Sequence, residues 1–212
     1  MLKAIIFDLD GTLLNTLDDI SDAVNYTLKH FNYKPKEKEE IRSYLGYGAN
    51  YLLTKSLNNN LDNFDEILTF YKNYLEKNSR NMTKPYDGIE KVLKKLKEKY
   101  VLAVVSNKHQ EAVSEVINYY FKDTFEVVIG EREGILKKPA PDLLNLALNK
   151  LNINSDEAIY IGDSEVDLKT AQNALLKSIL VSWGFREYHY LNTLNFDYLI
   201  KEPKEILKII GE

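Results

Sequence analysis

The stretch AIIFDLDGTL (residues 4–13) places two aspartates, Asp8 and Asp10, directly behind a run of apolar side chains. Side chains alternate along an extended strand, so the two carboxylates project from the same side if strand geometry continues to its end. Each of two crowded negative charges raises the pKa of the other unless a proton or a metal cation offsets them. An Asp-Gly hairpin turn is the competing interpretation of these residues alone. The stretch is therefore a candidate site at the end of a buried strand.

The composition is that of an ordinary globular protein. Of the 212 residues, 44% are hydrophobic and 28% are charged, and this length fits one core with a sizeable insertion. The net charge of -4 gives no reason to expect nucleic-acid binding, which favours an excess of Lys and Arg. The chain has no cysteine, which excludes disulfides and thiolate metal sites. Its first apolar run is too short for a signal peptide or a membrane span, so we expect a cytoplasmic protein without a membrane partner.

Short apolar runs alternate with amphipathic helical patterns, which predicts an α/β fold with a parallel sheet. The predicted strands are Ala4–Phe7, Val101–Val105, Phe125–Ile129, Ala158–Ile161, Ile179–Val181 and Tyr198–Ile200. Between residues 15 and 84 only helical patterns occur, and this interval is too long for a single crossover. We therefore expect a core formed by residues 1–15 and 84–212, flanked by helices, with an all-helical subdomain inserted at residues 16–83.

Polar residues follow four of the predicted strands, at the sheet edge where open parallel sheets bind ligands. The four segments are DLDGT with Asp8, Asp10 and Thr12; SNK with Ser106 and Asn107; KKPAP with Lys137 and Lys138; and GDSEVD with Asp163 and Asp167. Each segment alone has a structural explanation, because serine favours turns and acidic residues favour the start of a helix. The coincidence of all four predicts one shared pocket.

This set of side chains suits phosphoryl transfer. Asp8 is placed to attack phosphorus, giving an aspartyl-phosphate intermediate, and Asp10 is placed to act as general acid and base. Asp163 can join Asp8 in binding a hard, oxygen-seeking cation such as Mg²⁺, which offsets the crowded charge. The Ser106 hydroxyl and a lysine at 137 or 138 would hold the transferring oxygens.

The motifs DLDGTL, SNK, the lysine of KKPAP and GDSEVD resemble, in order and spacing, the four motifs of the haloacid dehalogenase superfamily of phosphohydrolases. The helical insertion resembles the cap of its phosphoglycolate phosphatase and β-phosphoglucomutase branch, and the resemblance implies a Rossmann-like core. Dehalogenases lack an acid at the position of Asp10, so its presence favours phosphate chemistry. In AQNALLKSI, Leu175 stands where the family commonly has glycine, so we expect the turn after that helix to differ.

The resemblance also implies a role for each motif residue. Asp8 would be the nucleophile and Asp10 the acid/base. The implied Mg²⁺ ligands are Asp8, the main-chain carbonyl of Asp10, and Asp163, while Asp167 supports the metal site without binding the ion directly. The substrate-binding candidates within the motifs are Thr12, Ser106, Asn107 and Lys138.

Substrate specificity is expected to lie in the cap, because lids close over a substrate and exclude water. Arg42 is the candidate there, since its guanidinium suits a carboxylate or a phosphate; a surface charge on a helix is the alternative.

The leading hypothesis is a magnesium-dependent phosphatase acting on a small phosphate monoester, with 2-phosphoglycolate as the first candidate substrate. The alternatives are a phosphomutase of the β-phosphoglucomutase type, a pyrophosphatase, and a phosphoacceptor module without turnover. The expected partner is a small phosphorylated metabolite, and the sequence leaves a monomer and a homodimer both open.

Overall fold

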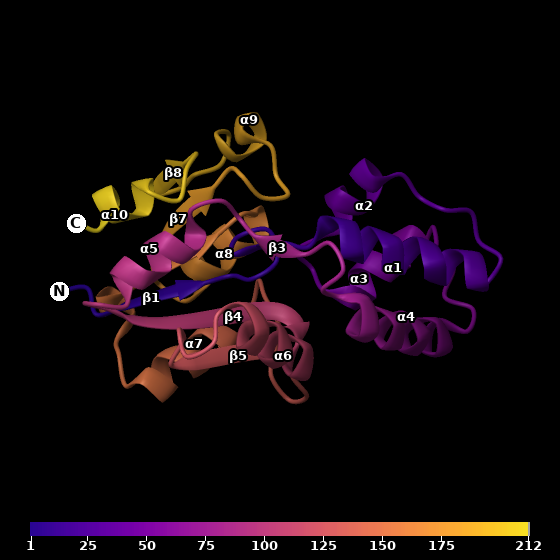
Figure 1. Cartoon of the computed structure of the whole chain (residues 1–212), viewed down its shortest axis with the longest axis horizontal. Coiled ribbons are helices and arrows are strands. Elements are labelled where there is room, and N and C mark those ends of the chain that lie inside the picture. Colours follow the sequence, from indigo (N-terminus) through magenta and orange to yellow (C-terminus); the bar gives the residue numbers. More distant parts are fainter. Residues whose placement is uncertain (212) are drawn as a thin grey trace.

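Six parallel strands form the central sheet of the computed structural model, which describes residues 1–211 (Figure 1). The strands are β1 (Ala4–Phe7), β4 (Val101–His109), β5 (Val127–Glu131), β6 (Ala158–Gly162), β7 (Lys177–Val181) and β8 (Tyr198–Ile200). Their order across the sheet is β5-β4-β1-β6-β7-β8, which places β1 between β4 and β6. The predicted α/β fold with a parallel sheet is thus confirmed.

Helices cover both faces of this sheet. They are α5 (Ile89–Leu96), α6 (Gln110–Tyr120), α7 (Asp142–Leu151), α8 (Glu165–Asn173), α9 (Tyr188–Leu191) and α10 (Glu205–Ile209). Ile5 and Phe7 of β1 belong to one hydrophobic cluster with α5, α6 and α10, whereas Ala4 and Ile6 belong to a second with α7 and α8. Because alternate side chains of β1 enter opposite clusters, the strand is buried on both faces, as its uninterrupted apolar run predicted.

The cap consists of α1 (Leu17–His30), α2 (Lys38–Tyr44), α3 (Ala49–Ser56) and α4 (Phe64–Asn78), and it lies beside the carboxyl ends of the core strands (Figure 1). These helices pack around a further hydrophobic cluster, separate from those of the sheet, which includes Val24, Ile41 and Leu53 of the cap and Phe185 of the core.

A short antiparallel pair, β2 (Leu14–Asn15) and β3 (Lys84–Pro85), connects the cap to the core. Sequence analysis missed this pair because two-residue strands carry no periodicity. Next to it, the buried Asp19 carboxylate accepts the N–H groups of Met82 and Thr83, each at 2.9 Å. The two chain segments that enter and leave the cap are therefore held together.

The turn after α8 places Leu175 in the left-handed region, with φ of +59°. The Leu176 N–H donates to the Ala171 carbonyl at 2.9 Å, and the Leu175 N–H donates to Gln172 at 3.2 Å. This is the hydrogen-bond pattern of a helix end that glycine usually provides. The turn therefore keeps that backbone conformation although leucine occupies the position, with its side chain 81% exposed.

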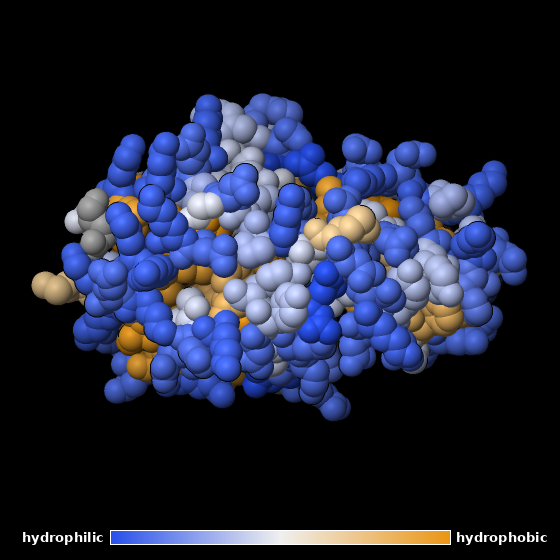
Figure 2. All heavy atoms as spheres, viewed as in Figure 1, coloured by the Kyte–Doolittle hydropathy of each residue, from blue (hydrophilic) through white to orange (hydrophobic). Residues whose placement is uncertain are grey.

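The surface is largely hydrophilic, with hydrophobic side chains visible mainly in gaps between charged ones (Figure 2). None of the helices within residues 1–211 combines the length and the apolar composition needed to cross a membrane.

Candidate active site

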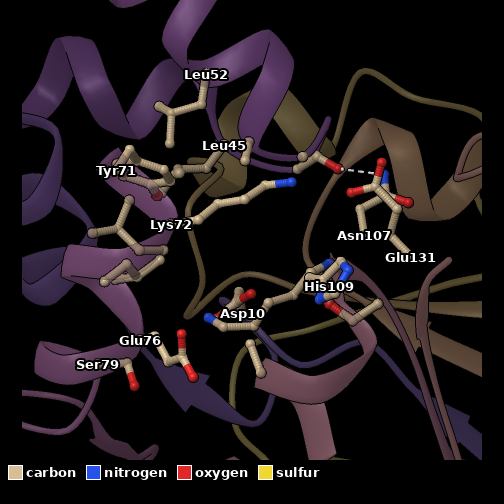
Figure 3. Close-up of a pocket in the computed structure, with 18 of the residues that line it drawn as sticks. Asp10, Leu45, Leu52, Tyr71, Lys72, Glu76, Ser79, Asn107, His109 and Glu131 are labelled. Atoms are coloured by element: carbon tan, nitrogen blue, oxygen red, sulfur yellow. Dashed lines mark hydrogen bonds and ion pairs between the residues drawn. The ribbon is translucent and has the colours of Figure 1, made fainter. Parts of the chain in front are cut away.

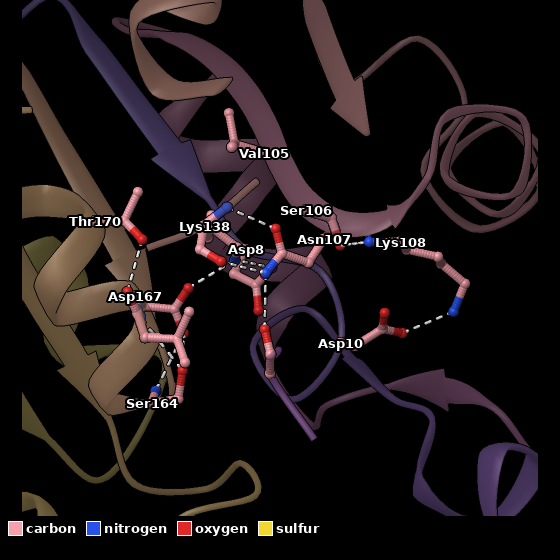
Figure 4. A network of polar contacts seen from close by, with 12 residues as sticks. Asp8, Asp10, Val105, Ser106, Asn107, Lys108, Lys138, Ser164, Asp167 and Thr170 are labelled. Carbon is pink, nitrogen blue, oxygen red and sulfur yellow. Dashed lines mark hydrogen bonds and ion pairs between the residues drawn. The ribbon is translucent and has the colours of Figure 1, made fainter. Parts of the chain in front are cut away.

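The carboxyl ends of the central strands bring most of the predicted site residues together (Figure 4). Asp8 directly follows β1, Asp163 directly follows β6, and Ser106 and Asn107 lie in the last part of β4. Asp8, Asp163 and Asp167 are all buried, and each offers a carboxylate oxygen within 4.8 Å of the others. The parallel sheet thus brings together three acids that are far apart in the sequence.

Lys138, from the loop between β5 and α7, lies among these acids. Its Nζ donates to Asp8 Oδ1 at 2.7 Å, to Asp167 Oδ1 at 2.7 Å and to the Tyr160 hydroxyl at 2.9 Å. The side chain is only 2% exposed, and these bonds use all three donors of the ammonium group. Lys138 therefore fixes one oxygen of Asp8 and leaves the other available.

Burial and neighbouring negative charge both disfavour the ionised form of the carboxyl groups in this cluster. Burial raises the pKa of Asp8 to about 7, with Lys138 opposing the shift and Asp167 adding to it. Burial, followed by the charges of Asp167 and Asp8, also raises the pKa of Asp163 well above its usual value. A hard divalent cation bound by carboxylate oxygens would supply the missing positive charge, so the cluster fits Mg²⁺.

Asp167 has both carboxylate oxygens engaged within the protein. Its Oδ2 accepts the N–H of Ser164 at 3.1 Å and the Ser164 hydroxyl at 2.6 Å, which caps the start of α8. Its Oδ1 accepts Lys138 and the Tyr160 hydroxyl, the latter at 3.0 Å. This geometry suits a residue that orients Lys138 rather than one that binds an ion.

Asp10 faces the cavity and contacts a lysine that sequence analysis did not assign. The Nζ of Lys108 donates to Asp10 Oδ1 at 3.0 Å (Figure 4). Lys108 is the third residue of the SNK motif, and its N–H donates to the Ser106 hydroxyl oxygen at 3.2 Å. The SNK motif could have indicated this lysine. Side chains two positions apart in a strand point to the same side, and Lys108 follows Ser106 by two positions in β4.

Asn107 uses its side-chain amide to hold two loops in place. The Asn107 Nδ2 donates to the carbonyl of Lys138 at 2.9 Å and to the carbonyl of Gly46 in the cap at 3.0 Å, while Oδ1 accepts the Lys138 N–H at 2.8 Å. Asn107 therefore fixes the loop that carries Lys138 and links it to the cap.

A cavity of about 320 Å³ lies between the core and the cap (Figure 3). Its core side is polar and includes Asp8, Asp10, Ser106, Asn107 and Lys138. Its cap side is mainly apolar and includes Ile20, Leu45, Ala49, Leu52, Tyr71 and Leu75. The cavity therefore combines charged groups at the strand ends with an apolar cover.

Lys72 of α4 also lines the cavity, and its side chain extends into it (Figure 3). The other cationic or basic lining residues have carboxylate partners: Lys108 with Asp10, His109 with Glu111, and Lys138 with Asp8 and Asp167. Within residues 1–211, Lys72 has no ion pair or hydrogen bond through its side chain. Sequence analysis missed it because a lysine on an amphipathic helix is usually a solvated surface charge.

Thr12 and Arg42, predicted to bind substrate, do not line this cavity. Thr12 is fully buried, and its carbonyl accepts the Trp183 indole N–H at 3.0 Å. The Arg42 guanidinium donates to Glu187 Oε1 at 2.8 Å and to the carbonyl of Gly184 at 3.0 Å. Arg42 thus links the cap to a core loop that follows more than 140 residues later in the chain. No local sequence pattern indicates such a contact.

Comparisons with known proteins identify the family and support the fold. The family model of the haloacid dehalogenase-like hydrolases matches residues 5–181. The chain is 33% identical to the phosphoglycolate phosphatase of Aquifex aeolicus, over 99% of this chain and 97% of that protein. It is 29% identical to the pyrophosphatase PpaX of Listeria monocytogenes, over 100% of this chain and 97% of that protein. A crystal structure of a protein from Lactobacillus delbrueckii, 30% identical, has a TM-score of 0.94 and covers 99% of both chains.

Proposed function

Because the chain belongs to the haloacid dehalogenase-like hydrolase family and is a phosphohydrolase, we propose that it hydrolyses a small phosphate monoester with Mg²⁺, through an aspartyl-phosphate intermediate. The observation that carries this proposal is the position of Asp8 at the cavity, with Asp163 and Asp167 within 4.8 Å and Asp10 beside it. A nucleophile, a proton carrier and a cation site thus meet at one place.

In the first step, the carboxylate of Asp8 attacks phosphorus. The bond from phosphorus to the ester oxygen breaks, and Asp10 gives that oxygen a proton. Lys138 holds Asp8 Oδ1 at 2.7 Å, so the carboxylate is oriented before the substrate arrives. A phosphate in the cavity offers Lys108 a second anionic partner, which frees Asp10 for proton transfer.

In the second step, Asp10 removes a proton from water, which attacks the phosphorus of the aspartyl-phosphate and releases inorganic phosphate and Asp8. The residues proposed to hold Mg²⁺ are Asp8, Asp163 and the main-chain carbonyl of Asp10. When bound, Mg²⁺ reduces the repulsion between the nucleophile and the phosphate. Asp167 keeps Lys138 beside Asp8, and Ser106, which lines the cavity, is proposed to bind a phosphate oxygen through its hydroxyl.

The position of Lys72 favours a substrate that carries a second anionic group besides the phosphate that is transferred. It is a cation on the apolar side of the cavity with no acidic partner in the described chain. A carboxylate or a second phosphate placed there would pair with it. 2-Phosphoglycolate has such a carboxylate and is the first candidate; pyrophosphate, with its second phosphate, is the second candidate, favoured by the similarity to PpaX.

The central test is the release of inorganic phosphate by Asp8→Asn and Asp10→Asn variants. With 2-phosphoglycolate, pyrophosphate and phenyl phosphate, each with and without Mg²⁺, we expect turnover by the wild type only with the ion. Both variants should lose turnover while keeping the wild-type circular dichroism spectrum. Near-normal activity in either variant would refute the assigned role. Isomer formation without net phosphate would indicate a mutase, and a lack of sustained turnover would indicate a phosphoacceptor module.

The role of Lys72 is tested with Lys72→Gln against Lys77→Gln, an exposed lysine of the same helix that does not line the cavity. Loss of a charged hydrogen bond should raise the KM for 2-phosphoglycolate about tenfold, and that for phenyl phosphate little. The Lys77 variant should match the wild type on both substrates. Equal effects of Lys72→Gln on the two substrates would rule out recognition of a second anionic group.

A further inference from the structure

The chain between β7 and α9 belongs to the core but packs against the cap. We call residues 183–187, with the sequence WGFRE, the docking loop. Figure 1 shows the segment between β7 and α9 on the side of the core that faces the cap. The Phe185 side chain is only 5% exposed and is a member of the hydrophobic cluster formed by the cap helices. One core side chain thus completes the interior of the cap.

The backbone of the same loop lies against Asp163. The Phe185 N–H donates to Asp163 Oδ2 at 2.6 Å. A Cβ atom added at Gly184 would lie 2.3 Å from the Gly11 carbonyl oxygen and 2.4 Å from Asp163 Cβ. Only glycine allows so close an approach. The docking loop therefore contacts the cap through side chains and a candidate metal ligand through its backbone.

Arg186 joins the core and the cap with one guanidinium group. Its Nε and Nη2 donate to the two carboxylate oxygens of Glu165, at 2.8 and 2.9 Å. The same group donates to the carbonyl of Leu45 at 2.9 Å and to that of Arg42 at 3.3 Å. These carbonyls lie at the end of α2, where a cation is favoured by the helix dipole. The side chain is 11% exposed, so these bonds are largely shielded from water.

Side chains of the cap also donate hydrogen bonds to the docking loop and to Glu165. Arg42 donates to the carbonyl of Gly184 at 3.0 Å and to the Glu187 carboxylate at 2.8 Å. The Tyr47 hydroxyl of the cap donates to Glu165 Oε1 at 3.2 Å. The docking loop is therefore held on both sides of Phe185.

The geometry assigns to the docking loop a role in coupling the position of the cap to the orientation of the Asp163 carboxylate, with Arg186 as the positioning residue. With the cap docked, the contacts on both sides of Phe185 keep its N–H on Asp163. When the cap moves away, Arg186 loses two carbonyl acceptors and the Phe185 ring loses its apolar surroundings. The loop can then leave Asp163, which loses a hydrogen bond that orients it.

The test compares Arg186→Ala with Arg80→Ala. Arg80 forms a different ion pair between the cap end and the core, with Glu115 at 3.0 Å, and it does not contact the docking loop. The first measurement is hydrogen exchange of the Phe185 amide, without metal or substrate, so it does not depend on the proposed reaction. The second is the Mg²⁺ concentration for half-maximal activity, which rests on the proposed function of Asp163.

For Arg186→Ala we expect exchange of the Phe185 amide to rise about tenfold, because a local contact that closes the loop is lost. The half-saturating Mg²⁺ concentration should also rise about tenfold, as is typical when a group that orients a metal ligand is removed. Arg80→Ala should change neither value. Unchanged Phe185 exchange in Arg186→Ala, or an equal rise in Arg80→Ala, would overturn the inference.

Arg186→Lys provides a variant that keeps the charge. A lysine cannot bind both oxygens of Glu165 and both carbonyls at once, so we expect effects between those of the wild type and the alanine variant. A lysine variant equal to the wild type in Phe185 exchange would also overturn the inference. Faster exchange with an unchanged Mg²⁺ dependence would support the coupling of loop and cap and would contradict the proposed metal role of Asp163.

Discussion

Replacement of Lys138 by methionine tests how the buried carboxylates are held. Methionine has a similar volume, so the change removes the charge and its hydrogen bonds to Asp8, Asp167 and Tyr160 with little loss of packing. Removal of one partner from a buried ion pair costs about 3–5 kcal/mol, because the other charge is left uncompensated. At about 2–4 °C per kcal/mol for a chain of this size, the Tm should fall by about 6–20 °C.

The assay is thermal unfolding followed by circular dichroism near neutral pH, with and without Mg²⁺. Because a cation that binds only the folded state stabilises it, Mg²⁺ should restore a larger share of stability in the variant than in the wild type. Lys3→Met is the matched control, since Lys3 pairs with Glu157 at the surface and its side chain is 57% exposed. That control should lose about 0–1 kcal/mol. An equally small loss for Lys138→Met would refute the reasoning.

Three further predictions concern pH, a turn and the cap connection. The pKa of Asp8 is about 7 in the folded, metal-free protein against 3.8 as the reference value, so the folded state binds more protons and its stability falls as pH rises between these values. Urea unfolding should show lower stability at about pH 8 than at about pH 6, by on the order of 1 kcal/mol or more because the raised pKa of Asp163 acts in the same direction, and constant stability would contradict this. Leu175→Gly should stabilise the protein by about 1 kcal/mol, since it relieves left-handed strain at an exposed side chain; an unchanged or lower Tm would argue against strain there. Asp19→Ala should cost about 1–3 kcal/mol and speed proteolysis near Met82, because it removes the acceptor of one buried and one partly buried N–H group; unchanged cleavage would count against this role.

The strands could be predicted because each is a short apolar run buried on both faces. β1 and β8 have the predicted bounds, whereas β5 begins two residues later than predicted, at Val127. Phe125 lies before the strand, and its apolar side chain serves the core instead: its ring packs edge-on against Phe7, with ring centroids 6.2 Å apart. Apolar character therefore located the strands, but it could not separate a strand residue from a loop residue that packs on the core.

The core site was predictable because chain order and strand polarity together decide which residues meet. A parallel sheet brings the ends of β1, β4 and β6 to one edge, so Asp8, Ser106 and Asp163 converge without further information. The cap side was not predictable in this way. By sequence pattern, Arg42 and Lys72 are both cationic residues of amphipathic helices and look alike. Only the packing of α2 and α4 determines that Lys72 lines the cavity while Arg42 contacts the docking loop.

The antiparallel pair of β2 and β3 has a consequence for how such a protein can diversify. The chain leaves and re-enters the core at adjacent positions, and among the described residues the cap cluster takes one buried side chain, Phe185, from the core, so the inserted segment can change while the core strands keep their pairing. A different insert with the same end spacing would leave the catalytic strands in register. New substrate ranges can therefore arise by change in one segment, provided that the new insert keeps the contacts with the docking loop that we propose to orient Asp163.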